Sequence, residues 1–336
     1  MRKTVRMWGC ISLVMTLLAG CGSAASTPKA SEAAKETKEQ VPVTQIMNWY
    51  AQADQGGQYA AQAQGFYKEA GIDMTIQPGG PQISTIQVVS SGKAQFGMAQ
   101  GDQVLMARAE GIPLVAVASL FQVSPQIILF QKNEPIQTFG DLNGRTVFVS
   151  PGSPYWEYIK KKYKLDQVNE LAFTGDFSGF LSNKTSGAQA YLNTAPFSLK
   201  EQGIETNYLK IYDSGYQPYA NVLFTTEKVL KENPKLVKAY VEASVQGWNY
   251  YKDHYKDVNP VLLKANPNLN ADLLNFGAES QRDLVFGGDA AEHGVGYMAE
   301  ARWTTLMKQL LEAGLIKKEV DVTKVFTNEF LPAPAH

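Results

Sequence analysis

The chain has 336 residues, of which 44% are hydrophobic and 19% charged, and its formal net charge is -1. Such a chain is a globular protein of about two domains, and the balanced charge excludes the basic surface that nucleic-acid binding requires. Both cysteines, Cys10 and Cys21, lie near the N-terminus. The rest of the chain therefore has no disulfide and no thiolate metal site, and the three scattered histidines do not predict a zinc cluster. No metal and no cofactor are expected.

The N-terminus has the pattern of a targeting signal. Arg2, Lys3 and Arg6 precede an apolar run, residues 11–19, that is too short to span a bilayer. The run ends in Leu18-Ala19-Gly20-Cys21, which resembles the bacterial lipoprotein box, in which the chain is cut before the cysteine and the cysteine sulfur is acylated. We therefore predict a signal peptide over residues 1–20 and lipidation of Cys21. The alternative is an ordinary secretory signal that is cut elsewhere.

The segment after Cys21 has the composition of a tether. Residues 22–39 contain no large apolar residue, so they cannot bury enough surface to order themselves. We expect a flexible tether over residues 21–41 and a folded body held by its lipid at the outer face of the cytoplasmic membrane.

The first half of the body alternates strands and helices. The predicted strands lie at residues 44–49, 72–76, 94–99 and 114–120, and the last of them is an apolar run. Helices are predicted between them: one at 58–69 that Gly71 caps, one that Ser91-Gly92 ends, and one at 103–110. The elbow Gln100-Gly101-Asp102 links a strand to a helix, which predicts a parallel sheet with the elbow at its carboxyl edge, where α/β proteins hold ligands.

The alternation then restarts before the chain becomes helical. The predicted elements of this second block are strands at 126–131, 145–150, 169–174 and 208–212 and helices at 155–163, 179–190 and 198–203. A strand at 221–225 follows, then a helix that Pro234 opens and three more at 260–265, 270–280 and 298–313. We predict two doubly wound α/β lobes joined by two crossing strands, with lobe 1 over 42–127 plus 222–336 and lobe 2 over 128–221.

The body contains five motifs, which are Asn48-Trp49, Gln64-Gly65-Phe66-Tyr67-Lys68-Glu69-Ala70-Gly71-Ile72-Asp73, Ser91-Gly92-Lys93-Ala94-Gln95-Phe96-Gly97, Ala107-Arg108-Ala109-Glu110-Gly111-Ile112-Pro113-Leu114-Val115 and Phe139-Gly140-Asp141-Leu142-Asn143-Gly144-Arg145. As a set they resemble the motifs of a known family, the solute-binding lipoproteins of ABC importers. That family includes sulfonate, nitrate, riboflavin and thiamine-pyrimidine binders and is grouped with a yeast pyrimidine synthase. The resemblance implies a type II periplasmic-binding-protein fold. It also implies a monomer that closes on a small-molecule ligand and delivers it to a permease with a cytoplasmic ATPase.

A cleft between two such lobes takes its ligand from turns at the carboxyl ends of strands. The predicted ligand-binding residues come from these turns and the adjoining helix starts: Asn48, Trp49, Tyr59, Gln100, Asp102, Gln122, Ser124, Ser150, Ser153, Tyr155, Trp156, Phe197, Tyr216 and Tyr219. Many are aromatic, and a flat heterocycle held between two rings gains burial plus about 0.5–1.5 kcal/mol per stacked pair. The alternative for each ring is core packing.

Asp102 bears on the class of ligand. A carboxylate at a helix N-terminus would repel an oxoanion and accept from an amino group or a protonated ring nitrogen, although capping the helix is its alternative role. This favours a thiamine-precursor aminopyrimidine. An alkanesulfonate such as taurine is an alternative ligand, because the turn 150–153 has no carboxylate and could hold an anion. Riboflavin is another alternative, because its ring would use the same aromatic loops. Thr194-Ala195-Pro196-Phe197 departs from the Glu-Pro pair that family members often show.

An enzyme is the alternative from another functional class. The yeast synthase has a cysteine-rich motif and an active-site histidine, for which this chain has no counterpart, and no Gly-x-Ser-x-Gly elbow or P-loop occurs. His254 lies in a polar run and is expected to be solvated. We therefore predict a binding protein and not an enzyme.

Overall fold

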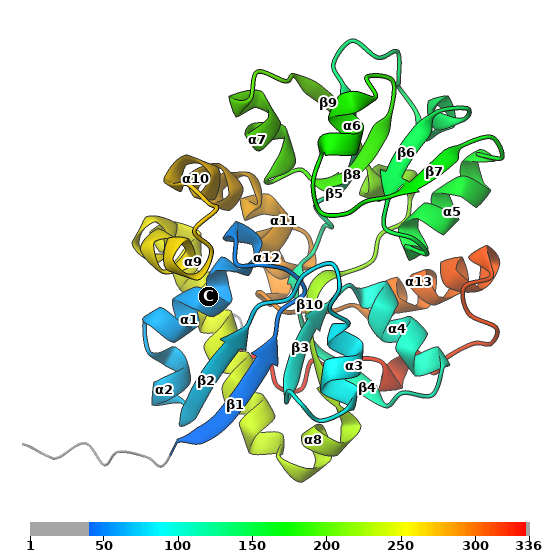
Figure 1. The fold of residues 1–336 in the computed structure, drawn as a ribbon. Coiled ribbons are helices and arrows are strands. Elements are labelled where there is room, and N and C mark those ends of the chain that lie inside the picture. Colours follow the sequence, from blue (N-terminus) through cyan, green and yellow to red (C-terminus); the bar gives the residue numbers. More distant parts are fainter. Residues whose placement is uncertain (1–39, 334–336) are drawn as a thin grey trace, which may run out of the picture. The chain divides into compact units, whose positions relative to one another are not determined.

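The computed structural model describes residues 40–333, so the predicted signal peptide and lipidation at Cys21 lie outside the described residues. The described chain forms two mixed five-stranded sheets with helices around each (Figure 1). We refer to the elements around them as the first and the second lobe. Within residues 40–333, no helix has both the length and the apolar character needed to cross a membrane.

The first sheet has the strand order β2-β1-β3-β10-β4. Its strands are β1 (Val41–Ile46), β2 (Ile72–Gln77), β3 (Phe96–Ala99), β4 (Leu114–Phe121) and β10 (Ala220–Thr226). β1 pairs in parallel with β2 and β3, whereas β10 runs antiparallel to β3 and β4. The parallel pairing expected around the strand before the elbow is confirmed for β1, β2 and β3, and β10 adds antiparallel pairing to the same sheet. The apolar edge strand β4 is nevertheless buried throughout, because bridges to Phe326 and Gly296 cover it.

The second sheet has the order β7-β6-β8-β5-β9. Its strands are β5 (Gln126–Gln131), β6 (Thr146–Val149), β7 (Asn169–Ala172), β8 (Gly187–Tyr191) and β9 (Thr206–Lys210). β5 runs antiparallel to β8 and β9, while β6 is parallel to β7 and β8. The chain passes from one sheet to the other between β4 and β5 and again between β9 and β10. The two predicted crossings are thus confirmed, and the exact lobe boundaries stay a prediction.

The helices of the first half of the first lobe are α1 (Gly56–Ala63), α2 (Phe66–Glu69), α3 (Thr85–Ser90) and α4 (Gly101–Ala109), with a 3-10 turn, η1 (Ala53–Gln55), before α1. The single helix expected over 58–69 is divided in two. Gly65 adopts a φ of 80° between α1 and α2, a left-handed conformation that a glycine tolerates and a continuing helix does not. The expected caps at Gly71 and Gly92 both have positive φ.

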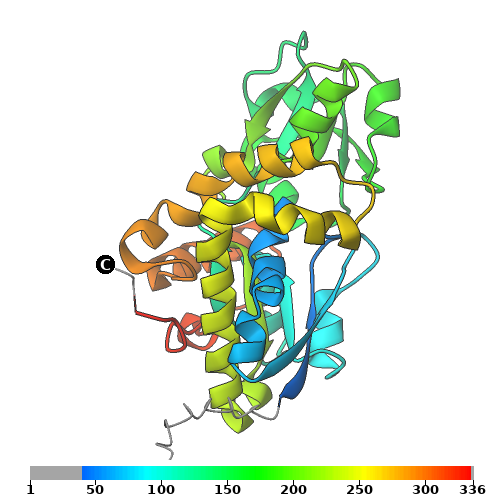
Figure 2. The same cartoon turned by 90° about the vertical axis from the view of Figure 1, so that its left-hand side faces the viewer.

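The C-terminal part of the first lobe is helical, as predicted. Its helices are α8 (Glu227–Glu232), α9 (Pro234–Ala265), α10 (Ala271–Ser280), α11 (Arg282–Phe286), α12 (Asp289–His293) and α13 (Glu300–Ala313). The separate helix expected at 260–265 is the last part of α9, which changes direction at the non-helical residue His254 (Figure 2). His254 is exposed, as expected.

The second lobe has the helices α5 (Pro154–Tyr163), α6 (Ser178–Ser182) and α7 (Ala195–Glu201). The predicted helix over 179–190 is wrong, because that stretch contains the short helix α6 and then strand β8. β8 lies between β5 and β6, and the backbone bonds to both neighbours outweigh the helical preference of its alanines.

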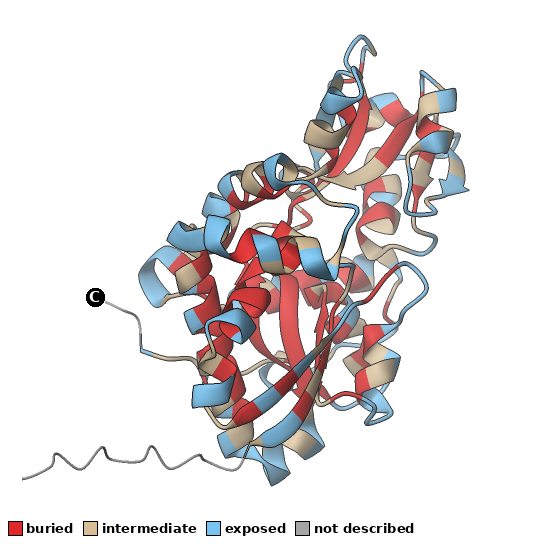
Figure 3. Ribbon diagram, turned by 60° about the vertical axis from the view of Figure 1, so that its left-hand side comes forward, coloured by how far each residue is buried: buried red, intermediate tan, exposed pale blue. Residues whose placement is uncertain are grey.

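Buried residues follow the strands and the inner faces of the helices (Figure 3). One hydrophobic cluster crosses between the lobes and includes Trp156 and Ile159 of α5 together with Trp303 and Leu310 of α13. On this side the two lobes therefore share a continuous apolar core.

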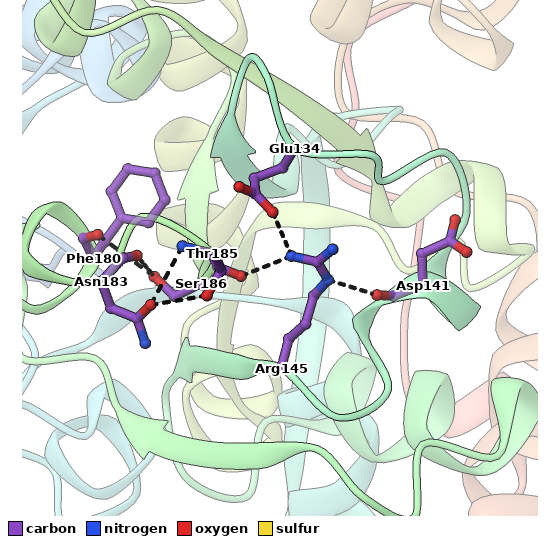
Figure 4. Close-up of polar contacts among 7 residues, drawn as sticks. All are labelled: Glu134, Asp141, Arg145, Phe180, Asn183, Thr185 and Ser186. Atoms are coloured by element: carbon purple, nitrogen blue, oxygen red, sulfur yellow. Dashed lines mark hydrogen bonds and ion pairs between the residues drawn. The ribbon is translucent and has the colours of Figure 1, made fainter.

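Arg145 forms hydrogen bonds to three other residues of the second lobe (Figure 4). Its guanidinium donates to Glu134 Oε2 at 2.5 Å, to the Thr185 carbonyl at 3.0 Å and to the Asp141 carbonyl at 2.9 Å. Asp141 in turn accepts from the backbone of Thr138 at 2.8 Å. The motif that ends at Arg145 thus has a structural role away from the cleft.

Candidate functional site

A cavity of about 490 Å³ lies between the two lobes. Its walls come from the turn after β1, residues 80–86, the start of α4, the start of β5, the turn after β6, and β8 with the turn that follows it. Six of the predicted ligand-binding residues line it: Asn48, Trp49, Gln100, Ser150, Ser153 and Tyr155. The turns expected at the carboxyl ends of strands therefore do converge on one space, and contact of these six with a solute stays a prediction.

The other eight predicted residues lie outside the cavity lining. Tyr59 is buried in the first-lobe core. Gln122 donates to the Tyr297 carbonyl at 3.0 Å, and Ser124 accepts from the backbone of Gln126 at 3.3 Å. These side chains hold neighbouring segments together instead of facing the open space.

The remaining aromatic residues of that set are also engaged elsewhere. The Trp156 indole donates to Glu170 at 3.0 Å, and Phe197 stacks on Phe276 of α10 with ring centroids 5.0 Å apart. Tyr219 accepts from the backbone of Ala299 at 2.7 Å. For these three rings the structure shows the packing role that was their alternative.

Asp102 is buried at the start of α4 and does not line the cavity. Its Oδ1 accepts from the backbone N–H of Gln103 at 2.8 Å, and its Oδ2 accepts from the Tyr216 hydroxyl, also at 2.8 Å. Burial raises the pKa of Asp102 to about 6, although the bond from Tyr216 opposes this. Each oxygen thus accepts one bond from a protein donor, and contact of Asp102 with a solute stays a prediction.

Asp54 is the carboxylate that the cavity contains. It lies in η1, fully buried, and its Oδ1 has no hydrogen-bond partner among the described residues. Asn221 Nδ2 donates to the Asp54 carbonyl at 2.7 Å and lies 3.4 Å from its Oδ2. Burial raises the pKa of Asp54 to about 6, against the effect of the Asn221 bond. Asp54 Oδ1 is therefore a buried acceptor without a donor among the described residues.

The side chains beside Asp54 are held in a chain of amides. Gln55 Nε2 donates to Asn48 Oδ1 at 3.1 Å, and Asn48 Nδ2 donates to Asn221 Oδ1 at 2.8 Å. Asn221, the second residue of β10, has a φ of 46°, a left-handed conformation that asparagine adopts more readily than most residues. The network fixes the floor of the cavity on the first lobe.

Gln100 forms a direct bond between the lobes. Its Nε2 donates to the Tyr191 hydroxyl of β8 at 2.6 Å, whereas its Oε1 is buried without a partner among the described residues. The bond leaves the Tyr191 hydrogen available to a ligand. Two residues of the first-lobe wall, Gln100 and Asp54, thus each have a buried acceptor without a partner among the described residues, Gln100 Oε1 and Asp54 Oδ1.

The second-lobe wall is a closed hydrogen-bond network around Gln189. Its Oε1 accepts from the Ser150 backbone at 2.6 Å and the Tyr155 hydroxyl at 2.9 Å, and its Nε2 donates to Ser150 Oγ at 2.9 Å. Ser153 Oγ donates to the Ser150 carbonyl at 2.7 Å. These bonds orient the wall before any ligand arrives.

The lining is aromatic as well as polar. Trp49 and Tyr155 were expected, and Phe173, Phe177 and Tyr191 join them. None of the described lining residues is Lys, Arg or His. Within residues 40–333, no group of three or more His, Cys, Asp or Glu side chains gathers closely enough to hold a metal ion.

Sequence reasoning missed Asp54, Gln189 and Tyr191. Asp54 lies in a stretch of small and polar residues that is indistinguishable from a solvated turn, and burial alone sets it apart. Gln189 was assigned to a helix over 179–190, and Tyr191 directly follows that range. Read as a strand, residues 187–191 alternate in direction, which would have placed both side chains on one face.

Comparison with known proteins agrees with the fold. A family model described as "NMT1/THI5 like" matches residues 52–257. The chain is 26% identical over 342 residues to the riboflavin-binding protein RibY of Chloroflexus aurantiacus, covering 96% of this chain and 97% of that protein. It is 25% identical over 303 residues to the formylaminopyrimidine-binding protein of Halalkalibacterium halodurans, covering 84% and 89%.

Enzymes also occur among the similar proteins. The chain is 32% identical over 262 residues to the 4-amino-5-hydroxymethyl-2-methylpyrimidine phosphate synthase THI12 of Saccharomyces cerevisiae, covering 69% of this chain and 73% of that one. Among solved structures, the periplasmic aliphatic sulphonate binding protein SsuA of Escherichia coli matches with a TM-score of 0.66 and 15% identity over 88% of this chain and 94% of that one. The structural match establishes the periplasmic-binding-protein fold.

Proposed function

The chain belongs to the NMT1/THI5-like family, and we propose that it is the solute-binding component of an ABC importer, which holds a small planar nitrogen heterocycle in the cavity between its lobes. Its partners on this proposal are the solute and a permease with a cytoplasmic ATPase. It would act outside the cytoplasm as a monomer.

The observation that carries this proposal is the pair of unpartnered acceptors on the first-lobe wall. A buried acceptor without a donor costs about 1–3 kcal/mol, which a ligand N–H recovers on binding. Asp54 Oδ1 and Gln100 Oε1 are both in this position. The solute that fits best therefore presents N–H donors and a flat ring for Trp49 and its aromatic neighbours.

The charge of the cavity separates the candidate solutes. The described lining holds one carboxyl, Asp54, and no cationic side chain, so a sulfonate would meet a like charge and no positive charge to offset its lost hydration. An aminopyrimidine of the thiamine-precursor type instead offers an amino group next to a ring nitrogen, which can carry a proton, and this edge matches a carboxylate. A relative named for binding formylaminopyrimidine supports this choice.

Riboflavin is the second candidate, on a separate observation. The cavity volume of about 490 Å³ is within the usual range for ligand sites, about 300–1,000 Å³, and leaves room beyond a single ring. Glutamine, serine and threonine side chains at its rim, including Gln126, Thr194 and Ser198, suit the hydroxyls of a ribityl chain. A relative named for riboflavin binding supports it.

We propose that the protein binds without catalysis. Residues 40–333 contain no cysteine, and the described lining offers no histidine as an acid or base. The relatives include both binding proteins and synthases, so the distinction rests on the residues of this cavity.

The chain's place in the cell follows from the predicted lipidation. Acylation of Cys21 would hold the protein at the outer face of the cytoplasmic membrane. Fractionation of cells tests this: the wild-type protein should appear with membranes, and Cys21→Ala should release it. Membrane association of the variant equal to the wild type would overturn the lipid anchor.

Ligand titration tests the solute class. Protein that starts at residue 40 is titrated with 4-amino-5-hydroxymethyl-2-methylpyrimidine, riboflavin, thiamine and taurine, while tryptophan fluorescence and melting temperature are followed. We expect a response to the pyrimidine or to riboflavin that Trp49→Phe reduces, because Trp49 is the tryptophan that lines the cavity. A response to taurine alone would contradict the heterocycle, and turnover of any compound would contradict the binding protein.

A further inference from the structure

Gln281, at the junction of α10 and α11, joins the two lobes without lining the cavity. It is almost fully buried. Its Oε1 accepts from Asn193 Nδ2 at 3.0 Å, and its Nε2 donates to the Ala53 carbonyl at 2.7 Å. Asn193 lies in the turn between β8 and α7 of the second lobe, and Ala53 directly precedes Asp54 in the first.

Both segments that Gln281 connects supply cavity walls. Gln52 and Asp54 line the cavity on one side, and Tyr191 and Thr194 line it on the other. The chain of bonds from Asn193 through Gln281 to the Ala53 carbonyl therefore links one wall to the other. Since its two ends belong to different lobes, the chain requires the lobes to be together.

The packing around Gln281 is tight enough to make this link geometrically specific. A Cβ added to Gly277 of α10 would lie 2.6 Å from the Ala53 side chain and 3.1 Å from the Asn193 carbonyl oxygen. The residue before Gly277, Phe276, stacks on Phe197 of α7. Thus α10 contacts both lobes at the point where Gln281 bridges them.

We propose that Gln281 is a positioning residue through which the approach of the second lobe orients Asp54 toward the solute. The Ala53 carbonyl belongs to the peptide that carries Asp54, so fixing this carbonyl restricts the direction of the Asp54 side chain. When the lobes separate, the bond to Asn193 is lost and this restriction weakens. The inference rests on the proposed solute-binding function for its purpose, but its geometry can be tested without a solute.

The test is the titration of Asp54 in the solute-free, full-length protein. NMR of aspartate side chains labelled with ¹³C measures the titration midpoint, and the variant Asp54→Asn assigns the Asp54 signal. Asp54 is buried, and the ionisable groups whose charges reach it are Tyr191 of β8 and Tyr251 of α9, both with a pKa raised by burial so that they stay neutral near pH 7. Gln281→Met and Asn193→Ala should each shift the Asp54 midpoint downward by about one pH unit, because the loosened contact admits water.

The matched control is Asn259→Ala. Asn259 donates to Asn275 Oδ1 at 2.8 Å, a part-buried hydrogen bond between side-chain amides that joins α9 to α10 within the first lobe. It should cost similar stability and leave the Asp54 midpoint unchanged. An unchanged midpoint in both Gln281→Met and Asn193→Ala, or an equal shift in Asn259→Ala, would overturn the inference.

A binding measurement separates this inference from the proposed function. With the pyrimidine or riboflavin, whichever the wild type binds, Gln281→Met and Asn193→Ala should each weaken binding at least tenfold, and the double variant should be no weaker than either one, because both break the same chain of bonds. Full additivity would contradict the shared chain. If the wild type binds neither probe, the proposed function fails, and the Asp54 titration still decides the role of Gln281.

Discussion

Asp54 and Asp102 are both buried acids of the first lobe, and burial raises the pKa of each to about 6. They differ in their partners. Asp102 accepts one bond at each oxygen, from Gln103 and from Tyr216, while Asp54 Oδ1 accepts none from the described residues. Burial by itself thus does not mark a binding residue. What distinguishes Asp54 from Asp102 is a place in the cavity lining together with an Oδ1 that accepts no bond from the described residues.

The supports of the two residues differ as well. Asp102 is on a nine-residue helix, α4, whose first turn a carboxylate stabilises. Asp54 is on a single 3-10 turn, and the helix after it, α1, lies against α9 at glycines. The Asp54 region therefore depends on close packing of α1 against α9 in addition to its hydrogen bonds. Each region can be disturbed without the other.

The largest expected effect is the loss of stability in Gly57→Ala, which disrupts the packing of α1 against α9 next to Asp54. A Cβ at Gly57 would lie 2.3 Å from the Trp248 ring, which is buried and cannot move aside freely. We expect a loss of about 3 kcal/mol of unfolding free energy, measured by urea denaturation. Gly140→Ala is the control, since its Cβ would meet nothing closer than 3.4 Å. Equal losses in the two variants would show that α1 and α9 can separate without penalty.

A smaller effect, on affinity, separates the two acids directly. Asp54→Asn should weaken binding of the heterocycle by roughly 10- to 100-fold, because a hydrogen bond to a charged group contributes about 1.5–3 kcal/mol. Asp102→Asn should change the affinity by no more than about threefold, since Asp102 does not line the cavity. Calorimetric titration of both variants measures this. If Asp102→Asn lowers the affinity as much as Asp54→Asn does, Asp102 contributes to solute binding and this prediction is wrong.

The sequence was sufficient for much of the fold. Strand β5 lies where it was predicted, over residues 126–131, and β2, β4 and β10 differ from prediction by two residues or fewer at either end. These strands are apolar runs bounded by turn residues, so local pattern and tertiary structure agree there. Strand β8 was missed because its sequence, Gly-Ala-Gln-Ala-Tyr, has helix-forming alanines, and only its neighbours β5 and β6 make it a strand.

The site was predictable in part, for a related reason. Trp49, Gln100 and Tyr155 follow strand ends or begin helices, which the topology brings to one edge. Asp54 has no such marker. Whether a polar residue in a turn faces water or a cavity depends on what packs over it, and here that is α9 and α10, more than 180 residues later in the chain.

The smallest of these effects is a change in the pH dependence of stability. A carboxyl with a pKa of about 6 in the folded state and 3.8 otherwise binds its proton more tightly when folded, so its contribution to stability is fully present below pH 3.8 and is lost as the pH rises through 6. Between pH 5 and pH 8 each such group should lower the unfolding free energy by about 1.4 kcal/mol. Urea denaturation at pH 5 and at pH 8 measures this change in unfolding free energy. Asp102→Asn should remove the contribution of Asp102 to it, and Asp54→Asn should remove a similar contribution. Asp73→Asn, at an exposed position of β2, is the control for losing a carboxylate from the surface. The opposite outcome is that Asp54→Asn reduces the change in unfolding free energy between the two pH values and Asp102→Asn leaves it as in the wild type. In that case the bonds from Gln103 and Tyr216 fully offset the effect of burial on the pKa of Asp102. The two acids would then differ in ionisation as well as in their hydrogen-bond partners.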